Sequence, residues 1–403
     1  MRYCAHTSFS YQDNEQIVMA YAKVLFSLLV CGTVLGLAGT DLVLPAIPSL
    51  PDALPGTIEQ AQLVLATFVA GTAIGLLVFG ELGARFDQRK LLLMALLAYG
   101  ALSYLATISA NLNQLVIIRF FQGLVCSAPA VFAPGIIRSV FDERGALRAI
   151  GLMGSIESLT PALAPIIGAW LLSFTDWKAS FYLTALLSMA LALVWALLFK
   201  RVTQLRSNNN RDGYRSLLKN REFMRHTLAH ACTLGGLLIF VFGAPTVIIR
   251  SMGGSLSDFV TMQLIGITLF IISANTTHWF VDKYGRENMI SFGSTLTAFG
   301  CLTILIYGLS GVDNPKVLWL LFIPVNLGLG LRGPPGFHKA VVAAGDNDAR
   351  GAAVLILAIL GVAAIGTAIG AVFIQEGLIP LALIASIVSS SSLAFLYLLK
   401  SQS

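Results

Sequence analysis

Charge is scarce in this sequence of 403 residues: only 11% of them are Asp, Glu, Lys or Arg, whereas 56% are hydrophobic. A soluble domain usually carries roughly 25% charged residues, so these charges cannot cover the surface of a soluble protein of this length. Most of the surface must therefore face lipid. The net charge of +6 does not indicate a nucleic-acid partner, because most of the basic residues fall in loops on one side of the predicted membrane.

Paired cysteines and the common catalytic motifs are also missing. The five cysteines have no C-x-x-C spacing, and most of them lie in apolar runs, as small buried hydrophobic side chains do. No G-x-S-x-G, H-E-x-x-H or Walker sequence occurs. We therefore expect neither an enzyme nor a metal or organic cofactor. Without a nucleotide-binding motif, the chain alone cannot use nucleotide hydrolysis as its energy source.

Long apolar runs dominate the rest of the chain. A transmembrane helix needs about 20 mainly apolar residues, and the first run is too long for the core of a cleavable signal peptide. The runs that meet this length predict twelve spans, at 22–46, 58–82, 90–110, 113–138, 146–173, 178–200, 224–249, 257–281, 288–310, 316–341, 349–374 and 377–400.

The basic residues of the loops predict the orientation. With both termini in the cytoplasm, most of the 26 Lys and Arg residues fall in cytoplasmic segments, and only Lys178, Arg250 and Lys316 fall outside. This is the distribution that the positive-inside rule requires. We expect a multi-pass protein of the bacterial inner membrane with a cytoplasmic N-terminal tail at 1–21, in which Met19 is an alternative start.

A polar stretch at 201–223 divides the chain into halves, 22–200 and 224–403. The halves echo each other, because the segment at 80–90 (GELGARFDQRK) is similar to the segment at 278–288 (HWFVDKYGREN). Tandem six-helix repeats with a site at their interface are an established transporter architecture. The sequence predicts an all-α membrane protein of twelve transmembrane helices in two six-helix bundles, joined by a cytoplasmic linker.

Ionisable side chains inside the predicted spans need a reason, because each costs at least about 2.5–3.5 kcal/mol to insert. Asp41 and Arg119 lie at similar depth in the first half, where we expect Asp41 to exchange protons and Arg119, with Gln122, to have a structural or gating role. The alternative is an ordinary acid at a helix end and an Arg that reaches the interface. Glu157 lies near the midplane and is expected to carry the proton or to bind a cationic group of the substrate. A neutral, hydrogen-bonded glutamic acid is its alternative.

Arg332 lies in the run GLGLRGPPG at 328–336 of the tenth span. Its glycines and prolines predict a break in the helix, which is tolerated at membrane depth only inside protein or beside water. Arg332 there is expected to bind an anionic group of the substrate. The alternative is an Arg that extends to the cytoplasmic surface.

The repeated loop segments resemble the signature G-x-L-x-D-R-x-G-R-[RK] of the major facilitator superfamily, and the resemblance covers residues 20–400. In that family the loop acts as a conformational latch, with its acid paired to a neighbouring helix. Ala84 stands at the acid's position in the first copy, so Glu81 or Asp87 would have to replace it. The matching residues expected to serve the latch are Gly80, Arg85 and Arg89 in the first copy and Asp282, Gly285 and Arg286 in the second.

Two further motifs narrow the resemblance. The segment Arg119–Gly123 is similar to the R-x-x-Q-G motif of proton-coupled members, and Pro161, Pro165 and Gly168 match a variant of the antiporter motif of exporters. Together they resemble the bicyclomycin- and chloramphenicol-resistance branch of the drug:proton antiporters. The resemblance implies that the fifth span packs on the eighth and that the halves rock between two orientations.

We therefore predict a proton-coupled exporter of drugs or small amphipathic molecules that works by alternating access, as a monomer, with the proton gradient as its energy source. Its partners are the small-molecule substrate, protons and the lipid bilayer, and no nucleic acid. A dedicated exporter of one endogenous metabolite, such as a siderophore, amino acid or nucleoside, is the alternative that Arg332 favours. Import by symport and a non-transporting membrane receptor are remoter alternatives.

Overall fold

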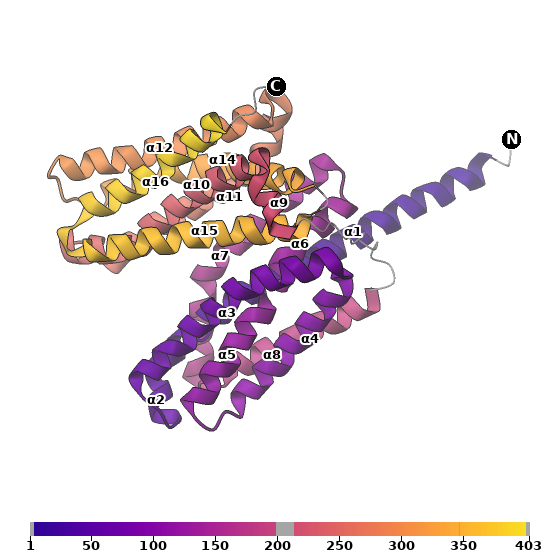
Figure 1. Ribbon diagram of the computed structural model, residues 1–403, viewed down its shortest axis with the longest axis horizontal. Helices are drawn as coiled ribbons and strands as arrows, with labels where there is room; N and C mark the ends of the chain where they lie inside the picture. Colours follow the sequence, from indigo (N-terminus) through magenta and orange to yellow (C-terminus); the bar gives the residue numbers. More distant parts are fainter. Residues whose placement is uncertain (1–3, 199–212, 346, 400–403) are drawn as a thin grey trace. The chain divides into compact units, whose positions relative to one another are not determined.

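Long helices form the structure, a computed structural model that describes residues 4–198, 213–345 and 347–399 (Figure 1). Within these residues the regular elements are all helical, so the predicted all-α class is confirmed. The helices are α1 (Cys4–Asp41), η1 (Leu44–Ser49), α2 (Leu50–Ala53), α3 (Ile58–Arg85), α4 (Gln88–Thr107), α5 (Leu112–Cys126), α6 (Ala128–Val140), α7 (Glu143–Phe174), α8 (Ala179–Leu198), α9 (Gly213–Lys219), α10 (Arg221–Thr246), η3 (Val247–Ser251), α11 (Leu256–Tyr284), α12 (Arg286–Leu309), α13 (Val317–Leu321), α14 (Ile323–Ala343), α15 (Asp348–Val372), η4 (Ile374–Glu376) and α16 (Leu378–Leu398).

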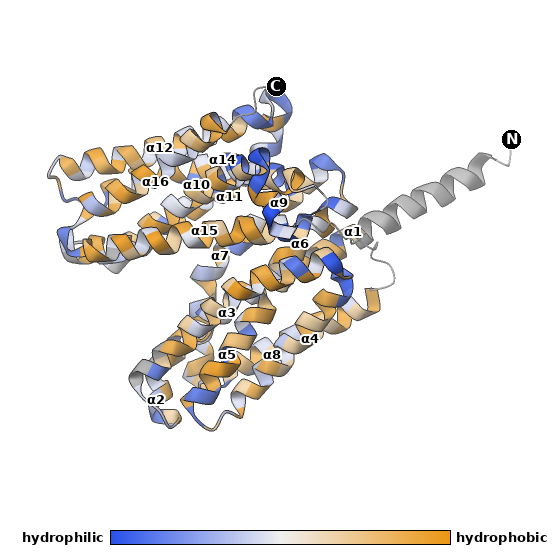
Figure 2. Cartoon of the chain, viewed as in Figure 1, coloured by the Kyte–Doolittle hydropathy of each residue, from blue (hydrophilic) through white to orange (hydrophobic). Residues whose placement is uncertain are grey.

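The lengths and composition of these helices agree with the predicted membrane spans. Among the described residues, 11 helical segments are long and apolar enough to cross a bilayer, and the bent helix α7 brings the number to 12. α7 bends by 43° between Glu143–Pro161 and Leu163–Phe174, where Pro161 and Pro165 each remove a backbone hydrogen bond. Hydrophobic residues cover the lengths of the helices, and hydrophilic residues gather at helix ends (Figure 2).

Two compact units make up the chain, and each is described by itself. Unit 1 consists of Met1–Gly75, Asp87–Ala149 and Thr160–Leu205, and unit 2 consists of Leu76–Phe86, Ile150–Leu159 and Arg206–Ser403. Unit 2 thus includes the last part of α3 and the middle of α7 in addition to the C-terminal helices.

The segments predicted as the tail and the linker are only partly described. α1 begins at Cys4, within the predicted tail at 1–21, and continues as one helix into the first span. In the predicted linker at 201–223, residues up to 212 lie outside the described part, α9 follows, and α10 begins at Arg221.

Small residues set the packing of unit 1. A side chain at Gly123 of α5 would collide with the carbonyl oxygen of Phe68 in α3, and one at Gly71 of α3 would collide with the carbonyl oxygen of Phe120 in α5. Glycines of this kind allow membrane helices to approach until their backbones touch. The final glycine of the R-x-x-Q-G motif therefore serves the contact between α3 and α5.

The Gly/Pro-rich tenth span differs from its prediction. α14 runs without a break through Pro334 and Pro335, so the predicted break in the helix is wrong. Pro335 has no N–H to donate to the carbonyl of Leu331 four residues earlier. Thr277 Oγ1 of α11 donates to that carbonyl at 2.7 Å. The neighbouring helix thus replaces the lost backbone donor, as membrane helices with internal prolines require.

Candidate functional site

Arg119 of α5 is held inside unit 1 by backbone carbonyls. Its side chain is buried, Nη2 donates to Gly39 O at 2.9 Å, and Nε donates to Val64 O at 3.2 Å. The guanidinium carbon also lies 4.1 Å from the centre of the Phe68 ring. Arg119 therefore reaches α1 two residues before Asp41, but among the described residues no ion pair joins Arg119 to Asp41. Its burial excludes the interfacial alternative.

Gln122 extends this network to a fourth helix. Arg119 Nη1 donates to Gln122 Oε1 at 3.4 Å, and Gln122 Nε2 donates to Ser103 Oγ of α4 at 2.8 Å. The spacing of three residues places Arg119 and Gln122 on the same face of α5. The two side chains of the R-x-x-Q motif thus connect α1, α3, α4 and α5.

Glu157 lies half-buried in the segment of α7 that belongs to unit 2. This segment packs on α11, because Asn275 Nδ2 donates to Ser155 Oγ at 2.7 Å. A side chain at Gly151 would lie 2.9 Å from the carbonyl oxygen of Ala274, so the glycine permits the close approach. The predicted pairing of the fifth span with the eighth is confirmed. Asp41, which ends α1 and is also half-buried, belongs to unit 1.

Glu81 occupies the place of the acid that the first loop motif lacks at position 84. Arg350 of α15 donates from Nε to Glu81 Oε2 at 2.7 Å and from Nη2 to Oε1 at 3.0 Å. Paired bonds of this kind are the strong form of a charge-assisted contact. Arg85 Nε donates to Oε1 at 2.6 Å, and Gly80 leaves room for Ala353 of α15. All five residues belong to unit 2, although Arg350 and Ala353 come from a helix far along the chain.

Asp87 has a local role instead. It begins α4 by accepting a hydrogen bond from the backbone N–H of Arg89 at 3.0 Å, and the Arg89 side chain lies 2.7 Å from its Oδ2. The hydrogen bonds from Arg89 hold the pKa of Asp87 below its usual range. Asp87 and Arg89 therefore cap the start of α4.

The second copy of the motif turns the chain between α11 and α12. Gly285 has φ +82° and ψ 157°, a region that only glycine adopts readily. Asp282 lies in the last turn of α11, and Arg286 is the first residue of α12. The backbone conformation of this corner explains why a glycine stands at position 285. The latch role of Asp282 and Arg286 stays a prediction.

Neutralising Glu81 is expected to destabilise the protein much more than neutralising Arg85, which also contacts Glu81. Glu81→Gln removes a charged partner from Arg350, whose side chain is only 3% exposed, so we expect a loss of up to about 3 kcal/mol. Arg85 is 60% exposed, and Arg85→Gln should cost no more than about 1 kcal/mol. Thermal unfolding of the purified variants in detergent measures both. Equal melting temperatures for the two variants would contradict this role of Glu81.

Glu287 is the centre of a charged cluster that the sequence analysis did not identify. Arg225 Nη2 of α10 lies 2.9 Å from Glu287 Oε2, Lys339 of α14 donates to Oε1, and His226 Nε2 lies 3.5 Å from Oε1. Arg225 and Lys339 lie near the ends of the predicted spans at 224–249 and 316–341, and no sequence motif links them to Glu287. They are 62 and 52 residues from Glu287 along the chain, and only the packing of α10, α12 and α14 brings them together.

Arg332 is fully buried in α14, which excludes the alternative of an Arg at the cytoplasmic surface. Its Nη1 donates to Ala229 O and to Thr233 Oγ1, both at 2.8 Å, and both acceptors belong to α10. Arg332 is therefore fixed by one nitrogen to the neighbouring helix.

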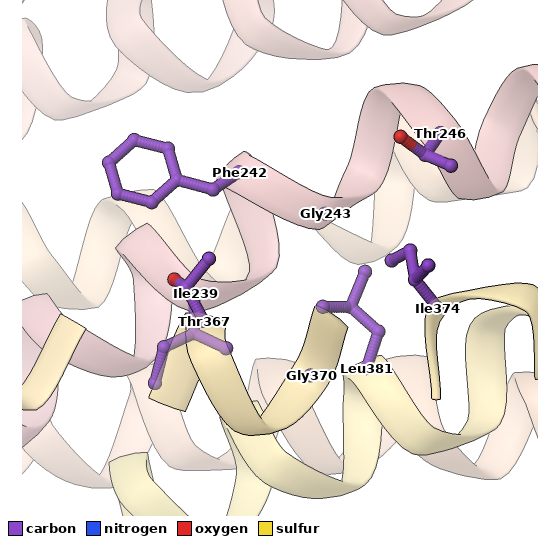
Figure 3. A pocket seen from close by; sticks show the side chains of 8 residues that line it. All are labelled: Ile239, Phe242, Gly243, Thr246, Thr367, Gly370, Ile374 and Leu381. Atoms are coloured by element: carbon purple, nitrogen blue, oxygen red, sulfur yellow. The ribbon is translucent and has the colours of Figure 1, made fainter. Parts of the chain in front are cut away.

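A cavity of about 240 Å³ lies in unit 2 beside α10, α15, η4 and α16 (Figure 3). None of its lining residues is charged, and none is among the predicted site residues. It offers an apolar wall with two threonine hydroxyls, which suits an apolar ligand or an acyl chain. The lining residues are Ile239, Phe242, Gly243, Thr246, Thr367, Gly370, Ile374 and Leu381.

Comparisons with known proteins agree with the helical arrangement. Residues 29–374 match the family model described as Major Facilitator Superfamily. The bicyclomycin resistance protein homolog of Haemophilus influenzae is 28% identical over 262 residues, which cover 62% of this chain and 65% of that protein. The chloramphenicol resistance protein of Pseudomonas aeruginosa is 27% identical over 268 residues, covering 66% of this chain and 62% of that protein. The chain thus spans slightly less than two thirds of the length of these relatives.

Solved structures show the same fold at low sequence identity. The transporter FucP in its outward conformation has a TM-score of 0.72 and 17% identity, covering 95% of this chain and 100% of that chain. A bacterial homologue of the iron transporter ferroportin has a TM-score of 0.74 and 11% identity, covering 93% of this chain and 98% of that chain. At these identities the likeness concerns the fold alone.

Proposed function

The chain belongs to the Major Facilitator Superfamily, and from this premise we propose that it exports drugs or small amphipathic molecules across the bacterial inner membrane in exchange for protons. It is a membrane transporter and not an enzyme. The observation that carries the proposal is the presence of Asp41 and Glu157, both half-buried, in membrane-spanning helices, where an ionisable group is costly and usually functional. The names of the relatives support drugs as the cargo.

Proton exchange at these carboxylates supplies the coupling. A proton that arrives from the outer side neutralises Asp41 or Glu157 and so changes the affinity of the site for cargo. A ligand or proton shifts a conformational equilibrium only as far as it binds the two states differently. Arg119 does not release a proton, because a guanidinium stays charged in proteins. Its bonds to Gly39 and Val64 instead position the end of α1 that carries Asp41.

A dedicated exporter of one acidic or zwitterionic metabolite is the second candidate. The buried guanidinium of Arg332 favours it, because such a group suits an anionic cargo better than a lipophilic cation. In this candidate Glu157 binds a cationic group of the same cargo. A biosynthetic operon around the gene would support it.

Transport in proteoliposomes tests the main proposal. Vesicles with an acidic lumen and an alkaline exterior are expected to accumulate labelled chloramphenicol or bicyclomycin, and nigericin should abolish the accumulation by dissipating the pH gradient. Substrate-dependent release of protons from the purified protein is the matching measurement without a membrane. Vesicles without protein are the control. Accumulation that is indifferent to the pH gradient would contradict proton coupling.

A further inference from the structure

Arg332 carries hydrogen-bond donors that the protein does not use. Nη1 is bonded to α10, but among the described residues no acceptor lies within hydrogen-bond reach of Nε or Nη2. His230 of α10 is 5% exposed, and its Nδ1 also lacks a partner among the described residues. A buried donor without an acceptor loses its hydration without compensation. Two such groups in one place indicate a site for a ligand that accepts hydrogen bonds.

The two groups converge at Gly336. The position that a Cβ atom at Gly336 would occupy lies 3.1 Å from Arg332 Nη2 and 3.4 Å from His230 Nδ1, and the next nearest atom is Arg332 Cζ at 3.5 Å. Both nitrogens therefore face the same side of Gly336, where one acceptor atom can bond to both. His230 donates to it in the tautomer that carries the proton on Nδ1. The neighbouring Phe337 packs edge-on against the His230 ring, with centroids 5.9 Å apart, and orients it.

The charges around this point favour an anion. The only described carboxylate of the nearby cluster is Glu287, which already contacts Arg225, Lys339 and His226. Arg332 therefore adds a further positive charge to a group in which two cations share one acid. A buried charge without a counterion is strongly unfavourable. A bound anion provides the missing counterion.

We propose that Arg332, His230 and Gly336 form a binding site for a monoanionic group. The group is either a free halide or the carboxylate of a transported molecule, since both present one small acceptor with a single negative charge. In the second case the inference rests on the transport function proposed above. Arg332 supplies the charge and one donor, His230 supplies the second donor, and the absence of a side chain at Gly336 leaves both donors uncovered.

Binding to the purified full-length protein in detergent tests the inference without any transport. The melting temperature in sodium bromide is compared with that in sodium sulfate at equal ionic strength. The melting temperature with benzoate is compared with that in the presence of its neutral counterpart benzamide. Stabilisation by both monoanions supports a general monoanion site. Stabilisation by bromide alone supports a resident halide, and stabilisation by benzoate alone supports the carboxylate of a transported molecule. Because no flux is measured, failure of proton-driven transport leaves this result unaffected. Stabilisation by neither monoanion overturns the proposal.

Two glycines of α14 give matched variants. Gly336→Ala places a methyl group between the two donors and keeps Arg332 and His230, so monoanion binding is expected to weaken at least about tenfold. Gly333→Ala changes the same helix where nothing lies within 4 Å of the new methyl group, and its binding should match the unchanged protein. Arg332→Gln should abolish binding. Normal binding by Gly336→Ala would overturn the assignment of the site, even if Arg332→Gln does not fold.

Discussion

Export driven by a pH gradient is expected to fall to the level of vesicles without protein when Asp41→Asn and Glu157→Gln are combined. Both substitutions keep the shape and polarity of the side chain and remove its ability to change charge. A transporter without an exchangeable proton cannot couple flux to the gradient, because the gradient then favours neither conformation. Glu157→Gln alone should already remove most of the gradient-driven flux, since Glu157 lies in the middle of a membrane-spanning helix.

Exchange of labelled for unlabelled cargo at equal pH separates coupling from transport. The neutral variants resemble the protonated state, so exchange should continue when gradient-driven export is lost. Asp52→Asn is the matched control, because Asp52 is an exposed acid in α2 outside the first span, and its flux should equal that of the unchanged protein. Intact gradient-driven export by the double variant would refute the coupling role of both carboxylates.

Replacing Arg119 is expected to destabilise the protein strongly. Arg119→Met removes the charged donor that Gly39 O, Val64 O and Gln122 Oε1 share in the interior of unit 1. Each hydrogen bond to a charged group contributes about 1.5–3 kcal/mol. Arg119→Lys keeps the charge but not the planar fork that reaches several acceptors at once, so it should restore stability only in part.

Thermal unfolding in detergent, together with the yield of folded protein, measures this effect. Arg148→Met is the control, because Arg148 is exposed at the start of α7 in unit 1 and its loss should change the melting temperature little. A melting temperature of Arg119→Lys equal to that of the unchanged protein would show that the bonds to α1 and α3 do not hold the unit together.

The fold was predictable from the sequence because membrane spans follow from local composition. The apolar runs and the contact of the fifth span with the eighth agree with the structure. The break predicted at Pro334 and Pro335 does not occur. Local composition could not reveal that the Thr277 hydroxyl, on another helix, donates to the carbonyl that lost its backbone donor.

The candidate site was less predictable, because its partners come from distant parts of the chain. The sequence predicts a structural or gating role for Arg119 but not its acceptors, which are backbone carbonyls that no sequence pattern marks. It offers Glu81 and Asp87 equally as the acid of the first loop motif, and the contact with Arg350 distinguishes Glu81. Glu287 has no sequence signal, because its partners come from the distant helices α10 and α14.

The hydroxyl of Thr277 has a mechanical consequence for α11 and α14. If α14 slid along α11 by even one turn, the Leu331 carbonyl would lose the hydroxyl that replaces its missing backbone donor, and an unpaired carbonyl is costly inside a membrane protein. The two helices are therefore expected to travel as one rigid pair during the transport cycle. We therefore expect motion within unit 2 to occur between other pairs of helices.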